Sequence, residues 1–157
     1  MEHSESHIKK NIQPFLLGLM DGSVSTLAPI FAAAFATHDP NVALIVGMSA
    51  STGAGISMAF AEGMSDDGAL TGRGHPVRRG LLTGFMTFVG GALHTLPFLL
   101  SNLDHALYLA YIVVIIELIA ISYIRYKYLR TNFLTSCIQV IVGGTLVFLS
   151  GYFIGQW

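Results

Sequence analysis

Charged residues are scarce in this sequence: only 11% of its 157 residues are Asp, Glu, Lys or Arg, whereas 53% are hydrophobic. An average soluble domain carries roughly 25% charged residues, and a soluble fold of this length has too little interior to hide so much apolar surface. The composition therefore excludes an ordinary soluble domain. With a formal net charge of -1, it also gives no basis for nucleic acid as a partner.

Cysteine is nearly absent as well. The single cysteine, Cys137, lies in an apolar stretch, which excludes an intramolecular disulfide framework and a cysteine-rich zinc site. A cleavable signal peptide is not visible, because the first thirteen residues are polar and the apolar run after them lacks a short apolar core with a cleavage site. We therefore expect the first apolar segment to remain in the mature protein.

Long apolar stretches are what the sequence has instead. Each is about long enough to cross a bilayer as a helix, and short polar breaks separate them. The five stretches are residues 14–37, 42–64, 80–100, 106–126 and 133–156. The predicted fold is an all-α membrane protein, a bundle of five transmembrane helices in residues 14–157, preceded by a cytoplasmic polar tail of residues 1–13.

The basic residues predict the orientation of this bundle. All eight fall in alternate breaks: before the first span, between the second and third, and between the fourth and fifth. They are Lys9, Lys10, Arg73, Arg78, Arg79, Arg125, Lys127 and Arg130. Cytoplasmic segments carry the excess of Lys and Arg in membrane proteins, so the N-terminus is predicted inside and the C-terminus outside. We expect a multi-pass protein embedded in the lipid bilayer of a bacterial inner membrane.

Three carboxylates fall inside the predicted spans: Asp21, Glu62 and Glu117. Charge at membrane depth is costly, so each acid is a functional candidate. Met58 and Glu62 share one face of the second span, at a depth comparable to that of Asp21 on the first. Carboxylates with a thioether favour a divalent transition metal, Fe²⁺ before Mn²⁺, over Mg²⁺ or Ca²⁺. We predict that Asp21, Met58 and Glu62 form a transient metal site whose acids carry protons when the metal leaves.

Each of these residues also has a structural interpretation. Asp21 and Glu117 can be protonated acids in interhelical hydrogen bonds, and Glu62 can be a boundary residue that reaches water. His94, in the third span, can be a structural histidine. Alternatively, Glu117 and His94 form a proton site or a second metal site.

The polar segments next to the predicted spans leave two further alternatives. Asp66 and Asp67, just below Glu62, either form a cytoplasmic entry for metal or cap a loop. The segment 2–7, with the residues Glu2, His3, Glu5 and His7, either collects metal or belongs to a disordered tail.

Glycines four residues apart occur in three spans. Such spacing lets helix backbones approach closely, and it predicts tight helix contacts or a subunit interface. The pairs are Gly18 and Gly22, Gly80 and Gly84, and Gly151 and Gly155.

The acid-bearing stretches resemble a known family. Residues 18–26 (GLMDGSVST) and 53–65 (GAGISMAFAEGMS) are similar to the vacuolar iron transporter family. Its signature is an Asp-Gly in the first helix and, in the second, a Ser-Met followed four residues later by Glu. Residues 65–74 (SDDGALTGRG) and 91–97 (GALHTLP) resemble the membrane half of the membrane-bound ferritins, in which a ferritin-like domain precedes this transporter module.

The resemblance implies a five-helix protomer, a homodimer with the path at or near its interface, and export of Fe²⁺ or Mn²⁺ from the cytoplasm in exchange for protons. By position, it implies Asp21, Met58 and Glu62 as metal-path residues. The metal would be a transported substrate, and we expect neither a permanently bound cofactor nor an enzymatic activity. Vacuolar members carry an acidic insert where this chain has only the loop 65–79, so a separate ferritin-like protein is a candidate metal supplier.

Two other function classes remain open. One is a membrane anchor or assembly subunit for a ferritin-like partner, which needs no buried acids. The other is a small multidrug-type exporter, which predicts more aromatic residues around Asp21 than the Ala, Gly and Ser in that span.

Overall fold

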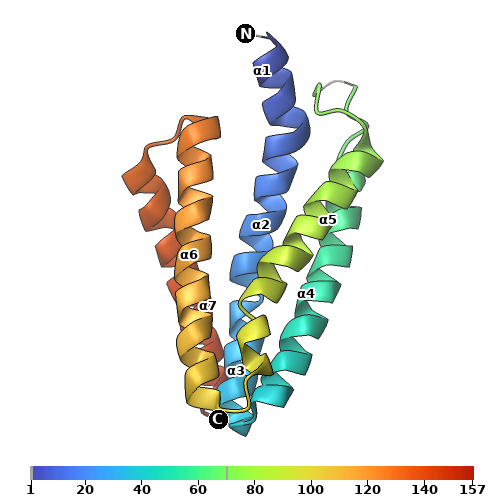
Figure 1. Ribbon diagram of the computed structural model, residues 1–157. Coiled ribbons are helices and arrows are strands. Elements are labelled where there is room, and N and C mark those ends of the chain that lie inside the picture. The colour runs from blue at the N-terminus through green and yellow to red at the C-terminus, as the bar shows by residue number, and fades with distance from the viewer. Residues whose placement is uncertain (1, 70) are drawn as a thin grey trace.

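The computed structural model describes residues 2–69 and 71–157, and its regular elements there are all helical (Figure 1). The α-helices are α1 (Glu2–His7), α2 (Gln13–Ser25), α3 (Leu27–Thr37), α4 (Pro40–Gly63), α5 (Pro76–Leu93), α6 (Leu103–Leu129) and α7 (Phe133–Gly155). A π-helical turn, η1 (Ile8–Ile12), joins α1 to α2, and a 3₁₀ helix, η2 (Leu96–Leu99), follows α5. The all-α prediction is confirmed for the described residues.

Among the described residues, four helical segments are long and apolar enough to cross a membrane. They are Glu5–Thr37, Pro40–Gly63, Leu103–Leu129 and Phe133–Gly155. The fifth, α5, has only 18 residues and begins with the basic pair Arg78 and Arg79. Its polar first turn and its short length leave it below the hydropathy and length of the other four. The structure thus supports four to five transmembrane helices.

The third predicted span, 80–100, is not one helix. Helix α5 begins earlier, at Pro76, and ends at Leu93, after which the chain turns and continues as η2. Pro97 explains the break, because it has no backbone N–H to give and disfavours the α conformation in the residue before it. This interruption places His94 at the end of α5, inside the bundle.

The first predicted span, 14–37, is also interrupted, at Thr26 between α2 and α3. Pro29 is the physical cause, because its missing N–H cannot bond to the carbonyl of Ser25 one turn earlier. The polar residues before the span are helical from Glu2 and lead through η1 into α2, and their place in the cytoplasm stays a prediction. The side chains of residues 2–4 lie outside the described part, so metal collection by segment 2–7 stays a prediction.

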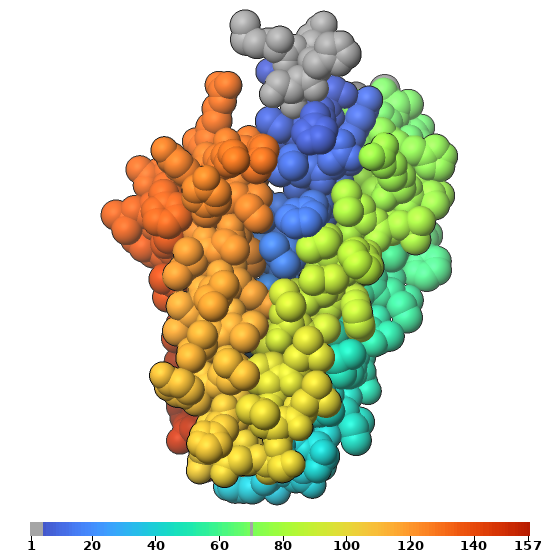
Figure 2. All heavy atoms as spheres, viewed as in Figure 1, coloured from blue at the N-terminus to red at the C-terminus, as the bar shows by residue number. Residues whose placement is uncertain are grey.

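Helix α5 packs between α2 and α4, and glycines allow the close approach (Figure 1). A Cβ on Gly18 or Gly22 would overlap the backbone carbonyls of α5, and a Cβ on Gly84 would overlap the backbone of α4. On the other side of the bundle, α3 packs against α7, where Gly155 lies against Ala32. Figure 2 shows α2 between α6 and α5, with α3 covered on this face.

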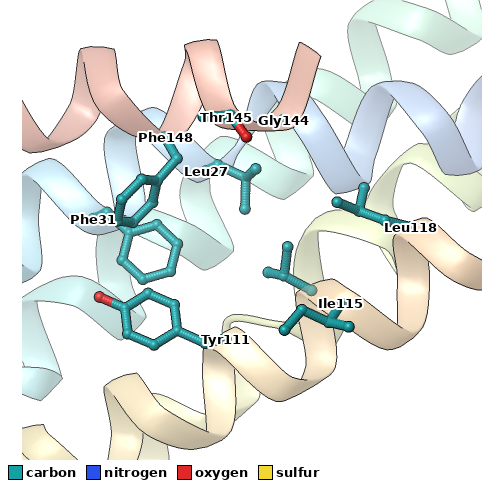
Figure 3. Close-up of a pocket in the computed structure, with 9 residues that line it drawn as sticks. Leu27, Phe31, Tyr111, Ile115, Leu118, Gly144, Thr145 and Phe148 are labelled. Atoms are coloured by element: carbon teal, nitrogen blue, oxygen red, sulfur yellow. The ribbon is translucent and has the colours of Figure 1, made fainter. Parts of the chain in front are cut away.

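Aromatic side chains fill the half of the bundle that contains α3. Phe31 stacks on Tyr111 with ring centroids 5.3 Å apart, and Phe148 packs edge-on against Phe31 at 5.0 Å. Together with Leu27 and Leu118, these rings line an apolar hollow between α3, α6 and α7 (Figure 3). This half of the bundle is therefore lined mainly by apolar side chains, and most of the polar candidate residues lie elsewhere.

The basic segments gather at one end of the molecule. The N-terminus, the link between α4 and α5 and the link between α6 and α7 lie at that end, whereas the C-terminus lies at the other (Figure 1). The outer faces of the helices carry large exposed apolar residues, among them Ile45, Phe85 and Leu146. An apolar belt between a basic end and an end without Lys or Arg is typical of a membrane protein.

Candidate functional site

Asp21 lines a hollow of about 460 Å³ between α2, α6 and α7. Arg125 and Gln139 line the same hollow, and Arg125 Nη2 donates a hydrogen bond of 2.8 Å to Gln139 Oε1. Asp21 is half-buried, and none of the ion pairs among the described residues includes it. Its carboxylate is therefore accessible to a ligand that enters the hollow.

Other donors of the hollow come from the same helix. Met20, next to Asp21, lines it and offers a thioether, and Ser25 lines it one turn further along. The carbonyl of Ser25 is the group that Pro29 leaves without its helical N–H. A carboxylate, a thioether and a carbonyl oxygen are ligands suited to a divalent transition metal.

Glu62 occupies a different place, near the end of α4, where two arginines hold it. Arg79 Nε lies 2.7 Å from Glu62 Oε1, and Arg73 donates to the same oxygen. Asp66 completes the group, because its carboxylate accepts from Arg73 at 3.1 Å and from Arg79 at 3.2 Å. We call Glu62, Asp66, Arg73 and Arg79 the arginine cluster. Arg79 is 1% exposed and Glu62 6% exposed, so these charges are desolvated and depend on one another.

The two loop acids are both engaged within the loop. Burial by itself would raise the pKa of Asp66, but hydrogen bonds from the Thr71 hydroxyl and the Gly68 N–H and the two arginine charges outweigh it. The pKa of Asp66 therefore lies below its ordinary value. Asp67 is exposed and accepts a hydrogen bond of 2.9 Å from the N–H of Ala69.

The α4 face that carries Met58 and Glu62 packs largely against α5. Gly55 lies against Gly84, and the Ser51 side chain fills the space beside Gly91. Met58 is half-buried on this helix. Since α5 lies between α4 and α2, Glu62 bonds to α5 rather than facing the hollow of Asp21.

The predicted metal residues are thus not gathered in one place within a single chain. Asp21 lies between α2, α6 and α7, whereas Glu62 lies between α4 and α5. Within residues 2–69 and 71–157, no group of three or more His, Cys, Asp and Glu side chains could hold a metal ion. Their shared role as ligands remains a prediction.

His94 and Glu117 are brought together, deep in the bundle. His94 Nδ1 lies 3.0 Å from Glu117 Oε2, and His94 Nε2 lies 2.9 Å from the hydroxyl of Thr26. The exposed fractions of His94 and Glu117 are 0% and 5%. The contact joins the end of α5, the middle of α6 and the break between α2 and α3.

Several partners in these sites escaped the sequence analysis. Arg73 and Arg79 entered it only as cytoplasmic charges, yet they hold Glu62. The sequence analysis assigned the thioether ligand to Met58, because Met58 shares a helix face with Glu62, and so it missed Met20. The position of Met20 next to Asp21 in the sequence could have indicated it. The contact of Thr26 with His94 could not be predicted without the fold.

The fold and these buried polar groups define an integral membrane protein with several helical spans and acids within them. The model of the VIT family matches residues 63–156, which is more than half of the chain. The chain therefore belongs to the VIT family, the vacuolar iron transporter family, and this membership indicates metal-ion transport. Searches of curated proteins and of solved structures gave no match. The matched segment contains His94 and Glu117 but not Asp21, Met58 or Glu62.

Proposed function

We propose that this protein moves Fe²⁺, and also Mn²⁺, out of the cytoplasm in exchange for protons. The observation that carries the proposal is Asp21, an acid within a membrane helix that lines an open hollow without an ion-pair partner among the described residues. Such an acid is costly unless it binds a proton or a cation in turn. Membership of the VIT family supports the proposal, because it indicates that the protein transports metal ions.

The first metal ligands in this proposal are the groups of the Asp21 hollow. The Asp21 carboxylate provides charge, and the thioether of Met20 provides preference for a transition metal over Ca²⁺ or Mg²⁺. Gln139 offers an amide oxygen once Arg125 releases it. When the metal leaves, a proton on Asp21 removes the cost of a bare charge in the bilayer.

A homodimer is the assembly we propose, following the resemblance stated above. The Asp21 hollow is open at the surface of the single chain, so a second copy can complete it with its own ligands. In this assembly Met58 and Glu62 remain the other metal-path candidates. For Glu62 to bind metal, at least Arg73, the more exposed of its two partners, must leave the carboxylate.

The direction of transport in this proposal follows from orientation. The three basic segments lie at one end of the bundle, which is the end expected in the cytoplasm of an inner membrane (Figure 1). The arginine cluster then lies at the cytoplasmic side, with Asp66 and Asp67 in the loop beside it. A separate metal-supplying protein of the ferritin-like class would dock at this end.

Metal flux in proteoliposomes tests the proposal. The reconstituted protein should carry Fe²⁺ in exchange for protons when a pH gradient is imposed across the membrane. Anaerobic conditions keep the iron reduced, and added Mn²⁺ should compete with Fe²⁺ for transport. Asp21→Asn should abolish the flux, because the amide can neither ionise nor exchange a proton. Asp104→Asn, an exposed acid in the first turn of α6, is the matched control and should transport normally.

Two results would reject this function. One is a flux equal to that of empty liposomes, which would favour a membrane anchor for a ferritin-like partner. The other is an unchanged flux in Asp21→Asn, which would remove Asp21 from the path.

A further inference from the structure

The hydrogen-bond network around His94 determines where its protons lie. The Thr26 hydroxyl donates its only hydrogen to the carbonyl of Gly22 at 2.8 Å. His94 Nε2, 2.9 Å from the same hydroxyl oxygen, must therefore be the donor in that contact. This assignment follows from the network, since hydrogen positions are inferred from their partners.

One further proton must lie between His94 and Glu117. His94 Nδ1 and Glu117 Oε2 are both acceptors when unprotonated, and they lie 3.0 Å apart, so a hydrogen has to join them. Placed on Nδ1, the proton makes an imidazolium beside a carboxylate. Placed on Oε2, it makes a neutral imidazole beside a carboxylic acid. In both cases the pair has no net charge, which suits its burial within the membrane.

Two polar atoms beside this pair are buried and lack partners among the described residues: Glu117 Oε1 and Ser23 Oγ. The Ser23 side chain lies next to Glu117 without completing a hydrogen bond. A buried polar oxygen without a hydrogen bond is costly. Of the two Glu117 oxygens, Oε1 is therefore the one that is not engaged with His94 and is open to a further hydrogen bond.

Among the described residues, no ion pair joins His94 or Glu117 to a third side chain. On α2, Asp21 lines the hollow that also contains Arg125 of α6. On α5, Arg79 is bound to Glu62 of α4 in the arginine cluster. Helix α7 contains no Asp, Glu, Lys, Arg or His. The charge of the pair therefore depends on its own proton.

We propose that His94 and Glu117 form the proton-exchange site of the transport cycle, separate from the metal ligands around Asp21. This inference rests on the proposed function, because it assigns a binding site to a proton that the protein exchanges for the metal. In the exchange, the pair gives up its shared proton on one side of the membrane and becomes singly negative. It then binds one proton from the other side and returns to neutrality.

The pair is linked to the metal helix through Thr26. When the shared proton is lost, Nδ1 and Oε2 face each other as two acceptors unless the imidazole carries its remaining proton at Nδ1. That second arrangement makes Nε2 an acceptor, so the Thr26 hydroxyl must turn from the Gly22 carbonyl and donate to His94 instead. Thr26 lies at the break between α2 and α3, on the segment that carries Asp21. The proton state of the pair thus acts on the helix break of the metal-binding segment.

Simultaneous recording of metal and proton movement in proteoliposomes tests this assignment. Wild-type protein should move Fe²⁺ with an opposing proton flux, read by a trapped pH dye. Glu117→Gln keeps a hydrogen-bonding group of the same size but cannot ionise, so it should still carry Fe²⁺ while the number of protons moved per Fe²⁺ falls to the share that Asp21 exchanges.

Two further variants bracket this result. Asp21→Asn should lose both fluxes, whereas His105→Gln, an exposed histidine on α6, should keep both in the wild-type ratio. A purely structural role for the pair would lower both fluxes together and leave their ratio unchanged. The proposal is overturned if folded Glu117→Gln retains the wild-type ratio of protons to metal, or if it loses metal flux as Asp21→Asn does.

An infrared pH titration of the protein in nanodiscs keeps the proposal testable if the variants do not fold. Wild-type protein with isotope-labelled glutamate and histidine should show a band that forms and disappears with pH, either a glutamic-acid carbonyl band or an imidazolium band, and Glu117→Gln should lack it. Absence of both bands overturns the proton site. If the band is present but no metal moves, the proposed transport function fails, while proton exchange at the pair is upheld.

Discussion

Arg79 illustrates how much one side chain decides at the basic end of the bundle. It is almost fully buried at the start of α5, yet it donates to the carboxylates of both Glu62 and Asp66. Its Nη2 also donates to the Glu62 carbonyl at 3.0 Å, which satisfies a backbone group at the end of α4. Two acids and a helix end therefore depend on one guanidinium.

We predict that Arg79→Met strongly destabilises the protein. The substitution keeps the apolar stem but breaks the buried ion pair and leaves Glu62 with only the more exposed Arg73 as a cationic partner. Removing one partner of a buried ion pair costs about 3 kcal/mol or more. Thermal unfolding in detergent measures the loss. Arg78→Met is the matched control, because Arg78 is exposed and bonds only to Asn11 in the described structure. Equal melting temperatures for the two variants would contradict the role of Arg79.

Asp66 should titrate below the ordinary range of an aspartate. Its ionised form is favoured in the folded loop, so it contributes stability above its unfolded pKa of about 3.9, and that stability is lost as pH falls through the lower folded value. The amide proton of Gly68, 2.6 Å from Asp66 Oδ1, reports this titration by NMR. Asp66→Asn should abolish the transition. A midpoint at or above the ordinary value would contradict the prediction.

The difference between the sequence and the structure is largest at this scale. Depth along the helices could be read from the spacing of Asp21, Glu62 and Glu117, but their partners depend on how the helices rotate and pack. Glu62 bonds to Arg79, seventeen residues later, only because glycines bring α5 against α4. The pairing of His94 with Glu117 likewise requires the turn after α5.

Helix α5 is the element that organises the bundle. It lies between α2 and α4, and its neighbours approach so closely that backbone touches backbone. Gly22 lies against the Thr87 carbonyl and against Gly91. The volume at these contacts, rather than hydrophobicity, sets the distance between the helices.

Gly22→Ala should therefore be destabilising. Its Cβ would overlap the carbonyl of Thr87, and such overpacking costs about 1–3 kcal/mol. Gly53→Ala is the matched control, because a Cβ on this α4 residue meets nothing within 4 Å. Parallel thermal unfolding of the two variants measures the difference. An unfolding temperature for Gly22→Ala as high as that of Gly53→Ala would argue against the close contact.

The elements that could be predicted from the sequence are those that hydropathy determines. The spans at 42–64, 106–126 and 133–156 correspond to α4, α6 and α7, because long apolar runs with polar breaks determine them directly. The breaks at Thr26 and His94 were harder to locate, since a proline can kink a helix, end it or be tolerated. The helical conformation of residues 2–12 had no signal in hydropathy.

At the scale of the whole molecule, the distribution of basic residues indicates how the bundle is oriented in a membrane. Basic segments lie at one end, and the links from α3 to α4 and from η2 to α6 lie at the other (Figure 1). The two termini lie at opposite ends of the bundle (Figure 1). The positive-inside rule predicts that the basic end, and with it the Asp66 loop, lies in the cytoplasm.

Cysteine labelling in intact cells tests this orientation. In a Cys137→Ser background, Ser101→Cys on the exposed link before α6 should react with a membrane-impermeant maleimide added outside. Asp67→Cys, on the exposed loop at the basic end, should react only after the membrane is opened. Both positions are exposed, so a difference between them reports the membrane rather than burial. The reverse pattern would invert the bundle and turn the proposed metal export into import.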